Sequence, residues 1–230
     1  MFWRWQIPGQ IGVIRFNNSL GEQNTVAAFD AALDGLSSAR GLVLDLRDVP
    51  SGGNSSVALG IMGRFVHKPL VYQQHRIPNY GQADVQRSWL ELVSPRGAFI
   101  YDGPVVLLVN HWTGSMGEGM AVGFDAMKRA AVVGTSMAHL AGAVDEFELQ
   151  QTGLRVAFAT EQLLHPDGTP RERWLPPVLV DELVDELVAE SANGGGDPLL
   201  ARAVQALVHL PAFLQLQEGQ PQRTPAAGAD

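Results

Sequence analysis

Short apolar runs alternate along this chain with segments whose apolar residues recur at helical spacing. Runs at residues 11–16, 41–46 and 105–109 predict strands, and the unbroken run 105–109 predicts a strand buried on both faces. Residues 26–39 predict an amphipathic helix, and further helical patterns follow at residues 57–65 and from Met116. Strands that lead through loops into helices are typical of an α/β protein, so we expect that class.

The rest of the chain has weaker patterns. Residues 69–103 are polar and poorly periodic, which favours a surface excursion over an insertion on the substrate side. After Asp181 one helical run is followed by a second short helix at residues 198–210. We therefore predict a single core over residues 1–210 and a mostly disordered tail over residues 211–230, which is rich in Pro, Gln and Ala.

Composition narrows the possible partners. The chain has 230 residues, of which 46% are hydrophobic and 17% charged, as expected for one globular domain. A formal net charge of −8 without a Lys/Arg cluster argues against nucleic acid as a partner, because its phosphates would be repelled. The absence of cysteine excludes disulfides and zinc–thiolate sites. Residues 1–10 lack the apolar core of a signal peptide, and no run reaches the length of a membrane span, about 18 apolar residues. The chain as written is therefore predicted to be soluble, and the sequence leaves its compartment open.

Ser115 lies between the predicted strand at 105–109 and the predicted helix that follows it. Glu118 follows in the first helical turn, where a carboxylate suits the positive end of the helix. Amide groups of that turn have no partner within the helix, so they can donate to an oxyanion that forms beside the serine hydroxyl. The alternative is that Thr113 or Ser115 is only the helix N-cap, which on this segment alone is the stronger interpretation.

A double glycine, Gly52-Gly53, follows the strand at 41–46. Glycine lets a backbone amide approach a ligand closely because no Cβ stands in the way. A serine at one strand–helix junction and a bare amide at another are the minimum that acyl transfer requires. By themselves the two glycines indicate a tight turn more strongly than a binding site.

Five segments occur in an order that resembles the tail-specific and tricorn-core serine peptidases. They are residues 9–16, Leu44 to Gly53, Val105 to Glu118, Ala130 to Thr135 and His165 to Glu172. The resemblance implies a ClpP/crotonase-like spiral of ββα units, with peptides or unfolded protein tails as substrates and no cofactor. It also implies that Ser115 is the nucleophile. The oxyanion hole would combine the amide of Ser115 or Met116 with one from Gly52 or Gly53.

One departure from the family pattern concerns the base. In the tail-specific branch a lysine lies twenty-five residues after the serine, and here that position is Leu140. The tricorn branch instead combines a serine with a histidine from an earlier segment and a late glutamate. The segment around Ser115 resembles that branch better, and Glu172 is the match for its glutamate.

A serine hydroxyl needs a base within hydrogen-bond reach, and histidine is the common choice near neutral pH. His139 adjoins the lysine position, so it is our candidate base, with a purely structural loop histidine as the alternative. His111 lies at the end of a strand, where it could line a cleft or cap the strand, and His165 lies in a turn that is typically structural. No histidine pair has metal-ligand spacing, so we predict no metal.

Three functions from different classes remain open. They are a serine peptidase, a silent relative that binds peptides, and a crotonase-type acyl-thioester enzyme. Relatives usually carry a helical segment, and often a PDZ domain, before the first core strand, which suggests that this chain is a fragment. We therefore expect exposed apolar surface at residues 11–16, a base supplied by His139 or by an absent segment or partner chain, and a possible homo-oligomer.

Overall fold

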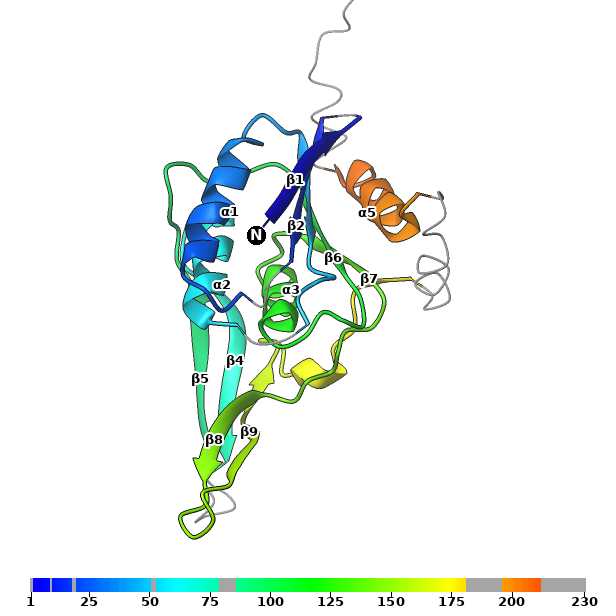
Figure 1. Cartoon of the computed structure of the whole chain (residues 1–230). Helices are drawn as coiled ribbons and strands as arrows, with labels where there is room; N and C mark the ends of the chain where they lie inside the picture. The colour runs from blue at the N-terminus through cyan, green and yellow to red at the C-terminus, as the bar shows by residue number, and fades with distance from the viewer. Residues whose placement is uncertain are drawn as a thin grey trace, which may run out of the picture.

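The computed structural model describes residues 2–8, 10–17, 20–50, 53–78, 86–180 and 196–211. Three features expected from the sequence lie outside these ranges: Gly52, the helical run after Asp181 and the tail beyond residue 211. The described part forms a main sheet with three α-helices on one face and one α-helix on the other, together with a second sheet (Figure 1). The expected α/β class is confirmed.

The main sheet has six strands in the order β1-β2-β3-β6-β7-β10. β1 is antiparallel to β2, and the other neighbours are parallel. Every residue of β3 and β6 is buried, as expected for strands covered on both faces. The strands are β1 (Phe2–Ile7), β2 (Ile11–Phe16), β3 (Gly41–Asp45), β6 (Val105–Val109), β7 (Ala131–Gly134) and β10 (Val178–Leu179).

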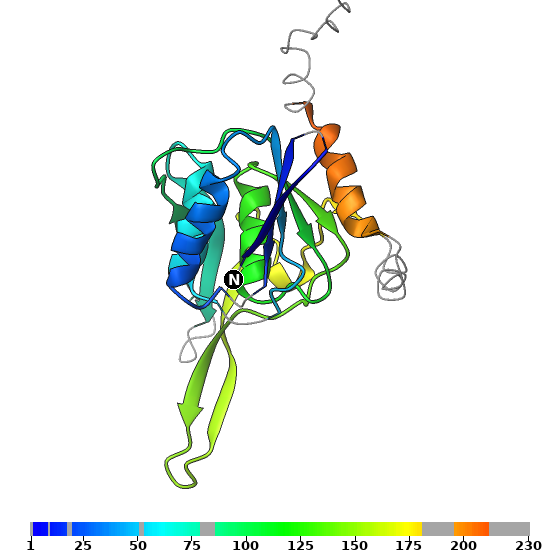
Figure 2. The same cartoon turned by 45° about the horizontal axis from the view of Figure 1, so that its top comes forward.

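Helices cover both faces of this sheet (Figure 2). On one face lie α1 (Asn24–Asp34), α2 (Ser55–Met62), the short 3-10 helix η1 (Gly63–Phe65) and α3 (Met116–Ala126). On the other face α5 (Pro198–Val208) packs its Leu199, Ala203 and Leu207 against the strands. Side chains from the two faces of the sheet therefore pack into two separate cores. The loops between strands and helices lie at the ends of the strands.

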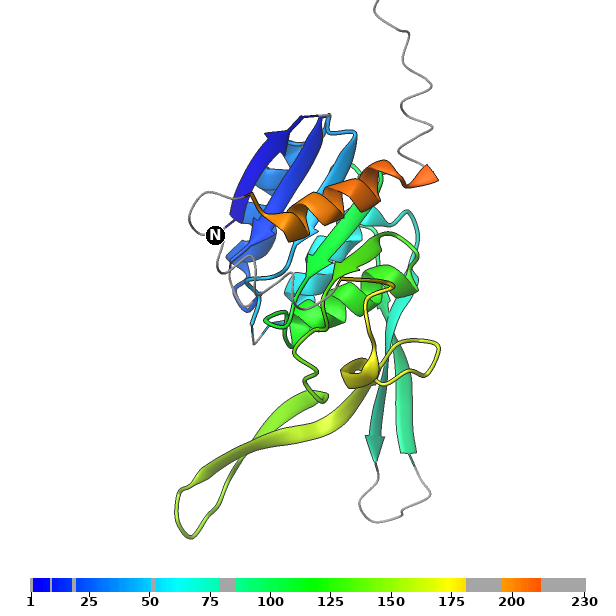
Figure 3. The same ribbon diagram turned by 90° about the vertical axis from the view of Figure 1, so that its right-hand side faces the viewer.

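A second, antiparallel sheet has the order β5-β4-β9-β8. Its strands are β4 (Leu70–Pro78), β5 (Gln86–Val93), β8 (Ala143–Glu148) and β9 (Arg155–Leu164). The hairpin of β8 and β9, residues 143–164, projects from the body and is here called the arm (Figure 3). A 3-10 helix, η2 (Arg171–Arg173), follows the arm.

Two sequence expectations are wrong. Residues 69–103 are not a plain surface excursion, because they contain β4 and β5 of a second sheet. Their polar residues hid the strand pattern, since Gln73 and His75 are buried and hydrogen-bonded to other side chains. Residues 11–16 were expected to expose apolar surface, but β2 is almost wholly buried because β1 pairs with its outer edge.

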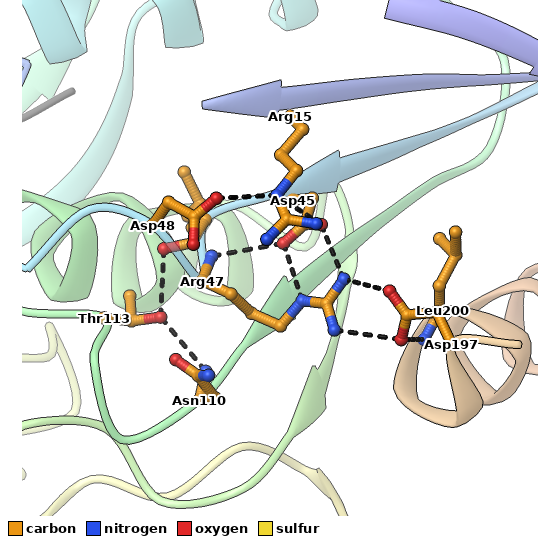
Figure 4. Close-up of polar contacts among 9 residues, drawn as sticks. Arg15, Asp45, Arg47, Asp48, Asn110, Thr113, Asp197 and Leu200 are labelled. Atoms are coloured by element: carbon orange, nitrogen blue, oxygen red, sulfur yellow. Dashed lines mark hydrogen bonds and ion pairs between the residues drawn. The ribbon is translucent and has the colours of Figure 1, made fainter. Parts of the chain in front are cut away.

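An ion-pair network fixes α5 to the end of β3 (Figure 4). Arg47 is 5% exposed and donates to both carboxylate oxygens of Asp45, at 2.9 and 2.8 Å. The same guanidinium donates to Asp197 at 3.0 and 2.6 Å, and Asp197 caps α5 by accepting from the Leu200 amide. Burial opposes charge on Arg47, but the two carboxylates outweigh it and raise its pKa. The network therefore ties the C-terminal helix to the strand that leads into the Gly53 loop.

Candidate active site

Ser115 closes a tight turn that the side chain of Thr113 helps to hold in place. Thr113 is fully buried, and its hydroxyl accepts from the Asn110 amide at 3.0 Å and donates to the Leu46 carbonyl at 3.1 Å. Ser115 itself has φ 53° and ψ −114°, a conformation that costs free energy for a residue with a Cβ. Such strain persists only where the surroundings impose it, and it is found at the nucleophile turn of α/β-hydrolases. As expected, the residue stands at the start of a helix, α3.

Glu118 decides which amide of this turn is free. Its carboxylate is fully buried and accepts from the Ser115 amide at 2.8 Å and from the Leu140 amide at 3.2 Å. Burial raises the pKa of Glu118, although Arg171 and the two amides act in the opposite direction. Because the Ser115 amide is already bonded, the Met116 amide is the first-turn donor that remains for an oxyanion.

The loop that carries Gly53 packs directly on the serine turn. The Gly114 amide donates to the Val49 carbonyl at 2.8 Å. A Cβ placed on Gly114 would lie 2.4 Å from the Pro50 carbonyl oxygen, so the two backbones touch. Gly53 has φ 119°, a value that favours glycine. The structure thus brings the two segments together that the sequence paired.

His139 lies in a second loop on the same turn. The residues on either side of it are tied there, since the Ala138 amide donates to the Thr113 carbonyl at 3.0 Å and the Leu140 amide donates to Glu118. The exposed His139 ring places Nδ1 2.8 Å from the main-chain carbonyl of Glu172. A carbonyl only accepts, so Nδ1 carries the proton and Nε2 is left as a basic nitrogen. No hydrogen bond joins His139 to Ser115 within the described residues.

Glu172 contacts His139 through its backbone and not through its carboxylate. Its Oε2 is buried and has no hydrogen-bond partner among the described residues. Glu172 also lines a pocket of about 320 Å³ together with Ala141, Gly142 and Glu161. The neighbouring Arg171, 2% exposed, donates to the carbonyls of Leu140 and Gly142 at 3.1 and 3.3 Å. Burial lowers the pKa of Arg171, against the charge of Glu118.

Three other histidines have partners away from Ser115. His67 bonds Asp102, His165 lies 2.9 Å from Asp167, and His209 bonds a carbonyl of its own helix. The described residues contain no group of three acidic, histidine or cysteine side chains placed to bind a metal. Nor do they contain a helix long and apolar enough to cross a membrane.

Sequence reasoning missed two residues of this site. Glu118 was assigned only a helix-dipole role, although its position three residues after Ser115 is the spacing of a capping box. Arg171 carried no local signal, because its carbonyl partners are 29 and 31 residues away in the chain. Glu118 connects the serine turn with the loop 139–142, and Arg171 ties that loop to η2.

Comparison with known proteins agrees with the fold. The model of peptidase family S41 matches residues 10–177. A search of curated proteins found no match. Among solved structures, a candidate peptidase from Parabacteroides merdae is 17% identical, with a TM-score of 0.75, over 90% of this chain and 64% of that one. Mature CPAF is 14% identical, with a TM-score of 0.72, over 95% of this chain and 55% of that one. The photosystem II D1 C-terminal processing protease is 24% identical, with a TM-score of 0.59, over 85% of this chain and 50% of that one.

These structural matches show the fold. The chain spans about half to two thirds of the length of the three proteins.

Proposed function

We propose that this chain, which belongs to peptidase family S41, cleaves peptides or unfolded protein tails through an acyl-enzyme formed on Ser115. The observation that carries the proposal is the strained backbone of Ser115 at the start of α3. That conformation presents a serine side chain at the helix end where amide donors gather. Two further loops, which carry Gly53 and His139, are hydrogen-bonded to the same turn or its flanks.

The proposed reaction uses these groups in turn. The Ser115 hydroxyl attacks the scissile carbonyl while a base takes its proton, and the amides of Met116 and Gly53 or Gly52 donate to the developing oxyanion. The protonated base then gives its proton to the leaving amine. Water, activated by the same base, releases the acyl group and restores the serine.

His139 Nε2 is the proposed base. The bond from Nδ1 to the Glu172 carbonyl fixes the tautomer that a general base needs. The ring is exposed and not yet bonded to Ser115, and such catalytic bonds often tighten only when substrate binds. Glu172 is proposed as the residue that orients the ring, in this structure through its main chain.

A silent peptide-binding relative is the second candidate. It is favoured by one observation, namely that no histidine nitrogen is hydrogen-bonded to the Ser115 hydroxyl in the described structure. A serine without a base retains only the modest help of an oxyanion hole and of substrate positioning. The acyl-thioester alternative has no comparable support, because enolate chemistry does not need a strained serine at the helix start.

Fluorophosphonate labelling separates the two candidates. We expect the wild-type chain and a Ser88→Ala control, which changes an exposed serine of β5, to be labelled, and Ser115→Ala to remain unlabelled. If His139 is the base, His139→Gln should lower the labelling rate by about 10²-fold, within the range of general-base catalysis. Equal labelling of Ser115→Ala would disprove the nucleophile, and a folded wild-type chain that is not labelled would favour the silent relative.

A further inference from the structure

His75 lies inside the second sheet with a carboxylate at each ring nitrogen. Nε2 is 2.7 Å from Glu91 of β5, and Nδ1 is hydrogen-bonded to Glu161 of β9. The side chains are 11%, 22% and 17% exposed, respectively, so little water competes for these bonds. A neutral imidazole has one N–H donor, and a carboxylate only accepts. An imidazolium is the form that satisfies both contacts at once.

The surroundings of His75 are consistent with a charged ring. Tyr72 and Gln73 donate to the same Glu91 oxygen, at 2.6 and 2.9 Å. Trp89 stacks on the imidazole of His75 with ring centroids 4.7 Å apart and an interplanar angle of 14°. The guanidinium of Arg87 lies 5.4 Å from the centroid of the Trp89 ring. Further charged groups lie near this cluster: Arg171 of η2 interacts with Tyr72, and Arg76 and Glu172 line the same pocket as Glu161.

The titration of the cluster follows from these contacts. Burial alone would lower the pKa of His75, but its bonds to Glu91 and Glu161 outweigh burial and raise it. Burial would likewise raise the pKa of Glu91, yet the bond from His75 and those from Tyr72 and Gln73 hold it at about 2.

Glu161 connects this cluster to the active-site loop. It pairs with Ala143 at the root of the arm, beside an irregularity in the strand register. The preceding Gly142 has φ 66°, and a Cβ there would lie 1.8 Å from the Glu161 carbonyl oxygen, so the two backbones are in direct contact. Arg171 holds the Gly142 carbonyl.

The next residue of η2, Glu172, binds His139. A continuous set of contacts therefore runs from His75, through Glu161, Gly142 and Arg171, to the loop beside Ser115.

We propose that His75 is a positioning residue whose imidazolium clamps β4, β5 and β9 together at the root of the arm and so holds the loop 139–142 against the serine turn. The catalytic part of this inference rests on the proposed function. When the ring loses its proton, at least one ion pair is lost and two carboxylates face each other across a neutral ring. The root of the arm then loosens.

The direction of the pH dependence follows from the raised pKa of His75. A histidine whose pKa is higher in the folded than in the unfolded chain stabilises the fold fully below the unfolded value, about 6.5. That contribution is lost as the pH rises through the folded value. The clamp is thus closed in mildly acidic solution and opens on the alkaline side of 6.5.

The test combines NMR titration with hydrogen exchange on the full chain. Histidine-selective labelling, with His75→Gln for assignment, reports the protonation of His75 between pH 5 and 9. Protection factors of the β9 amides report the closure of the arm root, and they do not require activity. We expect His75 to titrate above 6.5 and β9 protection to fall by about 10-fold through the same range. In His75→Gln, protection should be low at every pH.

Controls keep the outcomes distinct. His67→Gln changes an exposed histidine with a single carboxylate partner, Asp102, and should leave the profile as in the wild type. Glu161→Gln retains a side chain of similar shape and is used if His75→Gln does not fold. Where the chain can be labelled by fluorophosphonate, the wild type should be labelled faster than His75→Gln at about pH 6, and this difference should shrink as β9 protection falls.

Two results overturn the proposal: titration of His75 at or below 6.5, or equal β9 protection in the wild type and the variant throughout. A chain that is never labelled counts against the proposed function, while titration and protection still decide the clamp.

Discussion

Replacement of Gly114 by alanine tests whether the contact between the serine turn and the Gly53 loop sets the rate. The added Cβ would lie 2.4 Å from the Pro50 carbonyl oxygen, whereas ordinary contact begins at 3.4 Å. The obstacle is backbone, so no side-chain rotation relieves it. The loop must therefore move by about 1 Å relative to Ser115, and a misplacement of that size costs on the order of 10²-fold in rate.

That estimate agrees with the loss of one oxyanion-hole donor, which costs about 10²- to 10³-fold. We expect Gly114→Ala to be labelled by a fluorophosphonate about 10²-fold more slowly than the wild type and to lose about 1–3 kcal/mol of stability through overpacking. The assay measures the second-order labelling rate together with thermal unfolding. Gly196→Ala is the matched control, because nothing lies within 4 Å of its Cβ. A folded Gly114→Ala that is labelled within threefold of the wild-type rate would refute the reasoning.

Two further predictions concern stability and assembly. Asp197→Asn keeps a side chain that can cap α5 but removes the charge opposite Arg47. Asp197 is 28% exposed, so we expect the free energy of unfolding to fall by about 2 kcal/mol at pH 7, a value between those of an exposed and a buried ion pair. The pKa of Asp197 is lowered, because Arg47 and the Leu200 amide outweigh burial. Its contribution is present above the unfolded value, about 4, and lost as the pH falls, so urea unfolding near pH 3 should show a much smaller difference; an equal difference at both pH values would contradict the ion-pair account. On the arm, Phe147 and Phe158 stack with centroids 4.8 Å apart although they are 42% and 51% exposed. If copies of the chain associate, as the sequence led us to expect, replacing both by serine should give a monomer in sedimentation at a cost of only about 1 kcal/mol in stability; a wild-type chain that is monomeric at every concentration would contradict that expectation.

Local signals in the sequence determined much of the fold. The run Val105–Val109 and the helical spacing after Met116 predicted β6, α3 and the serine between them, because hydrophobic period and helix capping act over a few residues. The second helix near the C-terminus was predicted for the same reason. The strands β4 and β5 were missed, because their buried polar residues are satisfied by partners 16 to 86 residues away.

The arrangement of the candidate site depended on tertiary structure. The sequence named Ser115, His139 and Glu172, but only the fold places the backbone carbonyl of Glu172, and not its carboxylate, on His139. Only the fold shows that the Ser115 amide donates to Glu118, which makes the Met116 amide the proposed donor to the oxyanion. Arg47 and Asp197 are 150 residues apart, and nothing in either segment indicates the other. Such pairs form because packed strands and helices bring distant polar groups to one place and exclude water there. That gain depends on the whole core and is not encoded in any single stretch of sequence.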